Sequence, residues 1–257
     1  MDNNQLKKIN YDLIDTFLIA GERSIELRKI GLKKEIKSDN TPVTNGDIEV
    51  NNILTEKIKN ITSDIPIVSE ESSSNKSNNN LNDFWLIDPI DGTHDYINNK
   101  DEFTLNAGLI INKKPKLGII YAPAKKRLFY TYGNGSSFEL INNKEIKIKC
   151  EKKTKINQIK AVSYSEKLKP LIADFHNKFG VTDYQKMKSS LKFCVIATGE
   201  FDLYVAEPRA SEWDIAAGHA ILENAGGIIT DFENNEILYG KKDFKNPGLI
   251  LKRSNNL

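Results

Sequence analysis

The sequence predicts a layered α/β fold in which helices pack on the faces of β-sheets. Three observations predict it. Apolar residues recur at helical spacing over the first sixty or so residues. From about residue 65 to 150, alternating and continuous apolar runs separated by turn residues are typical of strands. The remaining residues alternate short apolar runs with helical patterns, and no linker separates two autonomous domains. We therefore expect one enzyme with two interlocked lobes.

The N-terminal segment is expected to form two helices. Residues 5 to about 30 carry apolar side chains at helical spacing. Pro42 excludes a helix in the polar stretch that follows. A second helix should begin near Thr44, which can cap it, with Asp47 in its first turn. The expected apolar face of this helix consists of Ile48, Ile53, Leu54, Ile58 and Ile61.

The rest of the chain is expected to form many short strands and three further helices. The Asn-Lys-Lys-Pro and Gly-Asn-Gly sequences at 112–115 and 133–135 indicate hairpin turns. The Ser/Asn-rich stretch 72–83 is expected to be an exposed loop. The expected strands are 65–69, 84–87, 103–111, 117–121, 127–132, 137–140, 146–149, 159–162, 203–205, 227–230 and 249–251. The expected helices are 167–179, 190–198 and 213–224.

Composition excludes several classes of protein. The chain has 37 Lys and Arg against 35 Asp and Glu, which gives no support to nucleic-acid binding as the main task. Cys150 and Cys194 have no metal-binding or disulfide spacing, which fits a reducing cytoplasm. No apolar run is long enough to span a bilayer, and the N-terminal residues contain no signal-like run. We expect a cytoplasmic protein without an integral membrane segment. Peripheral membrane association and oligomeric state are left open.

The segment with the densest chemistry is Asp88-Pro-Ile-Asp-Gly, directly after a buried strand. Pro89 and Gly92 favour an irregular turn, which would aim Asp88, Asp91 and the Ile90 carbonyl at one point. Oxygen ligands that converge in this way suit a hard cation such as Mg²⁺. An ordinary Asp-Pro and Asp-Gly turn explains the same residues, so both interpretations stay open at this point.

Further acidic residues add to the case. Glu70 and Glu71 end a predicted strand, and Asp214 lies in the first turn of a predicted helix. A carboxylate in a first helical turn often serves only to cap the helix or to interact with its dipole. That structural role is the default interpretation for Asp214, and equally for Asp47.

Two long motifs resemble those of a known family. WLIDPIDGTHDYIN at 85–98 and WDIAAGHAILENAGG at 213–227 resemble the two signature motifs of the inositol monophosphatase superfamily of Mg²⁺-dependent, lithium-sensitive phosphatases. The resemblance runs from about Ser38 to Gly248, and implies an αβαβα sandwich with metals at the junction of its lobes. It implies a single catalytic unit over residues 1–257, with lobes at about 1–150 and 151–257. Further matches are SDNTPVTNGD, VSEES, NKDEFTLNAGLI, GIIYAPAKKRLFY and SSLKFCVIATGEFDLY.

The resemblance also implies a metal-ligand set. One Mg²⁺ would be held by Glu70, Asp88 and the Ile90 carbonyl. A second would be held by Asp88, Asp91 and Asp214, and some members of the family bind a third. Clustered carboxylates repel one another unless divalent cations neutralise them, so the physical chemistry agrees with this assignment. Two metals about 4 Å apart can stabilise both the attacking and the leaving oxygen of an in-line displacement.

Other roles follow from the same motifs. Thr93 and Asp47 are similar to the pair that, with Glu70, orients and deprotonates the attacking water in this family. The backbone N–H groups of Gly92 and Thr93 can receive phosphate oxygens. The implied substrate-binding residues are Asp91, Gly92, Thr93, Ser189, Lys192 and Asp214.

Within the superfamily, the sequence most resembles the bacterial 3'(2'),5'-bisphosphate nucleotidase branch. This resemblance rests on Ser189-Ser-Leu-Lys-Phe-Cys, Glu102-Phe-Thr and Glu212-Trp-Asp. It implies that Ser189 and Lys192 contact the nucleotide or its second phosphate, although a lysine-rich chain also places lysines on solvated helix faces. The expected reaction converts adenosine 3',5'-bisphosphate to AMP and phosphate.

Several residues depart from the pattern of that branch. Lys188 replaces a glycine, Ser163-Tyr-Ser-Glu166 replaces Ser-Arg-Ser-His, and Val205-Ala206 replace Pro-Arg, which leaves Arg209 as the nearest arginine. The lost cations favour an inositol or broad sugar-phosphate phosphatase as the alternative. A non-catalytic nucleotide-binding regulator is a second alternative, and it is disfavoured because every acid that the chemistry needs is present.

Overall fold

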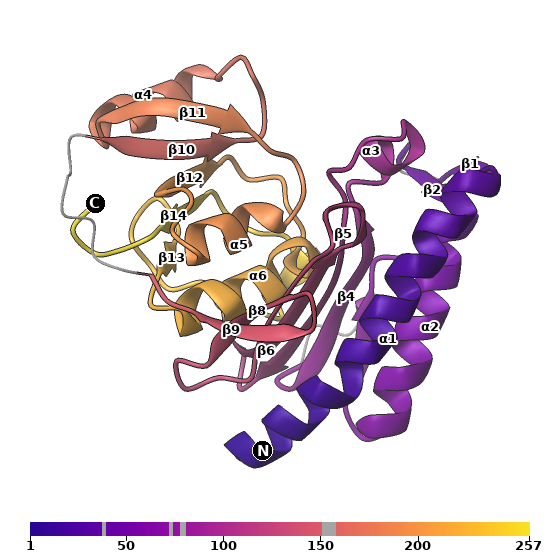
Figure 1. The fold of residues 1–257 in the computed structure, drawn as a ribbon. Helices are drawn as coiled ribbons and strands as arrows, with labels where there is room; N and C mark the ends of the chain where they lie inside the picture. Colours follow the sequence, from indigo (N-terminus) through magenta and orange to yellow (C-terminus); the bar gives the residue numbers. More distant parts are fainter. Residues whose placement is uncertain (38–39, 72–73, 78–80, 151–157) are drawn as a thin grey trace.

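The computed structural model describes residues 1–257 apart from 38–39, 72–73, 78–80 and 151–157 (Figure 1). The described elements form five layers: two N-terminal helices, a seven-stranded sheet, two central helices, a five-stranded sheet and one outer helix. This arrangement confirms the αβαβα fold class. Ser38, where the family resemblance begins, lies outside the described residues. So does the expected boundary between the lobes, and the division of the chain into those lobes therefore stays a prediction.

The two N-terminal helices were correctly expected. Helix α1 spans Asn3–Ile30 and α2 spans Asn45–Ile61. Strands β1 (Lys34–Ile36) and β2 (Pro42–Thr44) form an antiparallel hairpin between them. The inner stripe of α2 consists of Val50, Leu54 and Ile58, all fully buried. The expectation for Ile48 is wrong, because it is rotated by about 200° from Val50 on an α-helix and is 45% exposed.

The seven-stranded sheet follows chain order. Its first two strands are parallel and all later neighbours are antiparallel. The Asn112–Lys113 turn is two residues long, and both residues have positive φ angles of 52° and 61°. Such a turn matches the twist of a tight hairpin, so the expected hairpin is confirmed with a shorter turn. The strands are β3 (Ile67–Ser69), β4 (Phe84–Asp91), β5 (Thr104–Ile111), β6 (Lys114–Ala122), β7 (Arg127–Thr131), β8 (Ser137–Ile141) and β9 (Lys144–Ile148).

The five-stranded sheet is mixed, with the order β11-β10-β12-β14-β13. Its strands are β10 (Ile159–Ser163), β11 (Val181–Lys186), β12 (Leu203–Ala206), β13 (Ile228–Thr230) and β14 (Leu249–Lys252). The sequence did not predict β11, because this edge strand is mostly exposed and polar and therefore lacks an apolar signal. The helices of this half are α4 (Pro170–Lys178), α5 (Leu191–Ala197) and α6 (Glu212–Asn224). Short 3₁₀ turns lie at Ser74–Ser77, Pro123–Lys125 and Lys242–Phe244.

Helix α6 packs very closely on the seven-stranded sheet. At Gly108 of β5, a Cβ atom would lie 2.8 Å from the Cβ of Ala216, and at Gly118 of β6 it would collide with the carbonyl oxygen of Ala217. The absence of side chains at these two positions lets the helix backbone approach the strands. The start of α6 is thereby held beside the end of β4. No helix within the described ranges is long and apolar enough to cross a membrane.

Candidate active site

A cleft of about 550 Å³ lies beside the starts of α5 and α6, between residues of the two sheets. Its walls include the end of β4, the short helix α3 (Thr93–Ile97), the start of α6 and the loop after β12. The lining combines acidic and basic side chains. The acids are Glu70, Asp88, Asp91, Asp95 and Asp214, and the bases are His94, Lys188, Lys192 and Arg209.

A β-bulge in β4 brings two of these acids to one face. Asp88 pairs with Asn106 and Asp91 with Thr104, so three steps along β4 match two steps along β5. Residues three apart on a regular strand point to opposite faces, and one extra residue restores them to the same face. The expectation that Asp88 ends the strand is wrong, since pairing resumes at Asp91. The expectation that the irregular backbone aims both acids at one site agrees with this geometry.

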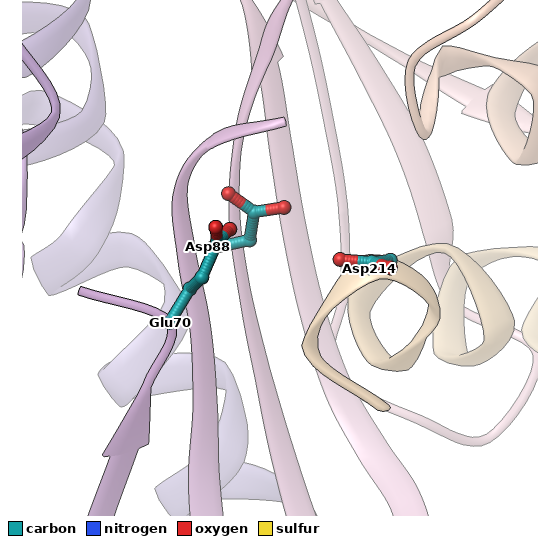
Figure 2. A group of neighbouring side chains, drawn as sticks. All are labelled: Glu70, Asp88 and Asp214. Carbon is teal, nitrogen blue, oxygen red and sulfur yellow. The ribbon is translucent and has the colours of Figure 1, made fainter. Parts of the chain in front are cut away.

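Three carboxylates from separate elements converge (Figure 2). Glu70 follows β3, Asp88 lies in β4, and Asp214 lies in the first turn of α6. One oxygen of each lies within 4.8 Å of the corresponding oxygens of the other two. Oxygen atoms at this spacing can share a divalent cation.

Asp88 is a buried member of the group without a hydrogen-bond donor among the described residues. It is 1% exposed, and neither side-chain oxygen accepts a hydrogen bond from an N–H or O–H group of the described residues. Burial, followed by the charges of Glu70 and Asp91, raises the pKa of Asp88 well above its ordinary value. Burial and the charges of Asp91 and Glu70 likewise raise the pKa of Asp214 to about 7. A buried carboxylate without donors is costly unless a cation binds it, so the donor set fits a divalent metal.

Asp91 lines the same cleft but is not part of the closest trio. Its carboxylate accepts a hydrogen bond from the backbone N–H of Ser190, at the start of α5. Burial raises the pKa of Asp91 to about 6, while the positive charge of Lys192 opposes that increase. The adjacent Ile90 carbonyl oxygen lies 3.0 Å from Thr93 Oγ1, whose single proton it shares with Asp47, and it keeps a second lone pair for another partner.

Thr93 and Asp47 form a hydrogen-bonded pair beside the acid cluster. Thr93 Oγ1 lies 3.1 Å from Asp47 Oδ1. The other oxygen of Asp47 accepts hydrogen bonds from the backbone N–H and the hydroxyl of Thr44, at 2.7 and 2.6 Å. Asp47 is fully buried, and burial raises its pKa. A raised pKa makes the carboxylate a better proton acceptor.

Asp47 and Asp214 each cap a helix, and each is also connected to the site, Asp214 directly and Asp47 through Thr93. Both occupy the third position of a helix and complete a capping box, Asp47 with Thr44 and Asp214 with Ser211. The Ser211 N–H donates to Asp214 Oδ2 at 2.7 Å. Because the cap uses one carboxylate oxygen, the other is available for chemistry. The structural role that sequence reasoning treated as the default is therefore real, and it does not exclude a functional role.

The residues expected to contact the substrate beyond the acid cluster, and the neighbouring Lys188, differ in burial and in their hydrogen-bond partners. Lys192 is buried and lines the cleft, where its ammonium group donates to the backbone carbonyls of Lys188 and Ser189. Lys188 forms an ion pair with Asp95 at 3.1 Å. Ser189 is fully buried, and its hydroxyl is not part of the cleft lining. Its neighbour Ser190 lines the cleft instead.

Sequence reasoning missed other residues of the site. Lys37 lies 3.0 Å from Glu70 and 2.7 Å from Glu71, in a segment where the family match gave no role to the lysine. Ser190 holds Asp91 through its backbone N–H, and its hydroxyl contacts Thr104 Oγ1 at 2.7 Å. A backbone donor carries no residue-specific signal, so the first of these Ser190 contacts could not have been found from the sequence.

The comparisons with known proteins agree with the resemblance seen in the motifs. The family profile described as inositol monophosphatase family matches residues 2–256. The 3'(2'),5'-bisphosphate nucleotidase CysQ of Salmonella typhimurium is 33% identical over 215 residues, which cover 82% of this chain and 85% of that protein. The crystal structure of CysQ from Bacteroides thetaiotaomicron superimposes with a TM-score of 0.75 at 30% identity, covering 94% of this chain and 96% of that one.

A more distant neighbour shows the same fold. The crystal structure of an IMPase/NADP phosphatase complexed with Mg²⁺ and phosphate superimposes with a TM-score of 0.79 at 21% identity. The match covers 96% of this chain and 91% of that one.

Proposed function

Because the chain belongs to the inositol monophosphatase family, we propose that it is a Mg²⁺-dependent phosphatase that converts adenosine 3',5'-bisphosphate to AMP and phosphate. The phosphatase activity follows from the family, and the nucleotide substrate is supported by the similarity to CysQ nucleotidases. The observation that carries the proposal is Asp88, a buried carboxylate with no hydrogen-bond donor among the described residues, surrounded by further acids.

The acid cluster is the proposed metal centre. Glu70, Asp88 and the Ile90 carbonyl would hold one Mg²⁺, and Asp88, Asp91 and Asp214 a second. Support comes from the convergence of Glu70, Asp88 and Asp214, and from the Mg²⁺ in the structure of the distant neighbour. Divalent cations bound here supply Lewis acidity and lower the pKa of an attacking water.

The proposed proton acceptor is the Thr93–Asp47 pair, which would act together with Glu70 on the attacking water. Thr93 Oγ1 takes a proton from the water while its own proton passes to Asp47 Oδ1, 3.1 Å away. Asp47 can accept this proton because burial raises its pKa. Thr44 donates two hydrogen bonds to Asp47 Oδ2, and these bonds keep Asp47 Oδ1 directed at Thr93. Thr93 is thus both a positioning group for the water and a relay.

The remaining proposed contacts hold the ester. The N–H groups of Gly92 and Thr93, at the start of α3, would receive oxygens of the phosphate that is cleaved. Asp91 and Asp214 lie beside the same position, and Lys192 would face the second phosphate. For Ser189, a direct contact with substrate stays a prediction, and its side chain would have to turn toward the cleft to make one.

The test is phosphate release from adenosine 3',5'-bisphosphate and from inositol 1-phosphate, measured in parallel with Mg²⁺, with EDTA and with added Li⁺. We expect activity only with Mg²⁺, a kcat/KM clearly higher for the nucleotide, and inhibition by Li⁺. Preference for the inositol ester would replace the nucleotide assignment with the sugar-phosphate alternative. Saturable nucleotide binding without turnover of either ester would support the regulator alternative.

A further inference from the structure

Lys192 is a buried cation without an acidic partner at contact distance. Its residue is 5% exposed, and among the described residues no carboxylate lies close enough to form an ion pair with it. Two of its three ammonium donors are used by the carbonyls of Lys188 and Ser189, and the ammonium nitrogen lies 5.2 Å from the centre of the Tyr204 ring. One donor therefore remains for an acceptor inside the cleft.

Arg209 lies at the same end of the cleft, at its surface. The residue is exposed, and its guanidinium lies 3.7 Å from the centre of the Tyr164 ring. Stacking of this kind and a side-chain hydrogen bond to Tyr164 orient the planar guanidinium, and its five N–H donors exceed what one hydroxyl can accept. Arg209 also has no carboxylate at ion-pair distance within the described part of the chain. Both Lys192 and Arg209 line the same cleft, and the pKa of Lys192 is lowered mainly by burial and further by the charge of Arg209.

Lys188 lines the cleft too, but it already has an acidic partner. Its ammonium lies 3.1 Å from Asp95, which also lies 3.6 Å from Lys100. The three cleft residues that could replace missing cations are therefore not equivalent. Lys188 has a carboxylate at ion-pair distance, whereas among the described residues Lys192 and Arg209 have none, and Asp91 and Asp214 act on Lys192 only at longer range. Two such charges favour binding of an anion between them.

We propose that Arg209, braced by Tyr164, forms with Lys192 an anion subsite that selects substrates with a second phosphate. The inference rests on the proposed phosphatase function of the same cleft, and it adds two residues, Arg209 and Tyr164, to those that the family motifs suggest. Lys192 forms the fixed inner wall and Arg209 the outer wall. Lys188 contributes to the connection with α3 and not to this subsite.

The experiment compares the wild type with Arg209→Gln and with the matched control Lys188→Gln, which removes a cation from the same cleft. The readout is kcat/KM on adenosine 3',5'-bisphosphate divided by kcat/KM on adenosine 3'-monophosphate, which lacks the second phosphate. We expect Arg209→Gln to lower this ratio roughly 10- to 100-fold, as expected for a charge-assisted hydrogen bond. Lys188→Gln should change it by less than about threefold. Tyr164→Leu, which removes the brace but keeps the charge, should lower it by an intermediate factor.

The outcomes separate the inference from the proposed function. Equal losses on both substrates in Arg209→Gln, or a larger change of the ratio in Lys188→Gln, would overturn the inference. A wild type that prefers a non-nucleotide bisphosphate such as fructose 1,6-bisphosphate, with the same penalty in Arg209→Gln, would support the subsite and reject the nucleotide substrate. A wild type that hydrolyses monophosphates better than every bisphosphate would reject both.

Discussion

The acidic and the cationic parts of the cleft are supported by different kinds of structure. Glu70 follows β3, Asp88 lies within β4 next to its bulge, and Asp214 lies in the first turn of α6. Asp214 is fixed by a capping hydrogen bond, and the position of Asp88 is fixed by sheet pairing. Arg209 lies on a loop after β12, and a single aromatic ring holds it. The proposed chemistry thus depends on the scaffold, and the proposed selectivity depends on a loop that can change without disturbing it.

The largest expected effect comes from breaking the acidic part at Asp88. Asp88→Asn should lower kcat/KM roughly 10³-fold or more, because loss of a metal ligand removes several kcal/mol of transition-state stabilisation. Thermal unfolding without metal should show no loss of Tm, since the substitution removes a buried charge that has no donor. A substantial decrease in the metal-free Tm would show that Asp88 is needed for folding. That result would contradict the functional role proposed for this carboxylate.

Removal of the proposed relay should have the next largest effect. Thr93→Val keeps the shape of the side chain but removes the hydroxyl between Asp47 and the Ile90 carbonyl. We expect kcat to fall roughly 100-fold, within the range of general-base contributions, and the Mg²⁺-induced Tm shift to persist. Thr93→Ser should restore most of the activity. A Thr93→Val enzyme with nearly wild-type kcat would remove the relay from the mechanism.

The metal dependence of stability should vary with pH in a definite direction. The folded-state pKa values of Asp91 and Asp214, about 6 and about 7, lie above the values of unfolded aspartates. The folded, metal-free protein therefore binds protons more tightly than the unfolded chain, and it loses stability as pH rises from about 4 to 7.

Mg²⁺ requires the ionised carboxylates, so the stabilisation that it gives should grow over the same interval. We expect a Tm increase of about 5 °C at pH 8 with Mg²⁺ at about 100 times its Kd, and almost none at pH 5. The measurement is differential scanning fluorimetry with Mg²⁺ and with EDTA across this pH range. A shift that is equal at both pH values would contradict the assignment of these acids as ligands.

The smallest expected effect comes from a conservative substitution at Arg209, in the cationic part of the cleft. Arg209→Lys keeps the charge but loses the planar stack on Tyr164. The loss of stacking should lower kcat/KM for the bisphosphate by about three- to fivefold, with no change in the Mg²⁺-induced Tm shift. Steady-state kinetics and the same thermal assay check this. A changed metal response would show that the two parts of the cleft are coupled.

The difference between the two parts also explains what could be predicted from the sequence. The two motifs at 85–98 and 213–227 are continuous, so their acids were found, and both α1 and α2 were expected from spacing alone. The bulge in β4 could not be found, since it depends on pairing with β5. The ion pair between Lys188 and Asp95 could not be found either. These two residues lie 93 positions apart in the sequence, and no local pattern predicts a contact over that distance.

The double use of Asp47 and Asp214 has a consequence for local motion. Each carboxylate holds the first turn of its helix with one oxygen, and Asp214 also lines the cleft, whereas the second oxygen of Asp47 contacts Thr93, which lines it. Fraying of either helix start must therefore withdraw an acid from the site, and a cation bound there opposes the fraying. Amide hydrogen exchange at Thr44 and Ser211, whose N–H groups are bonded to these acids, should therefore slow when Mg²⁺ occupies the proposed metal centre. The helix starts and the proposed metal centre should therefore open and close together.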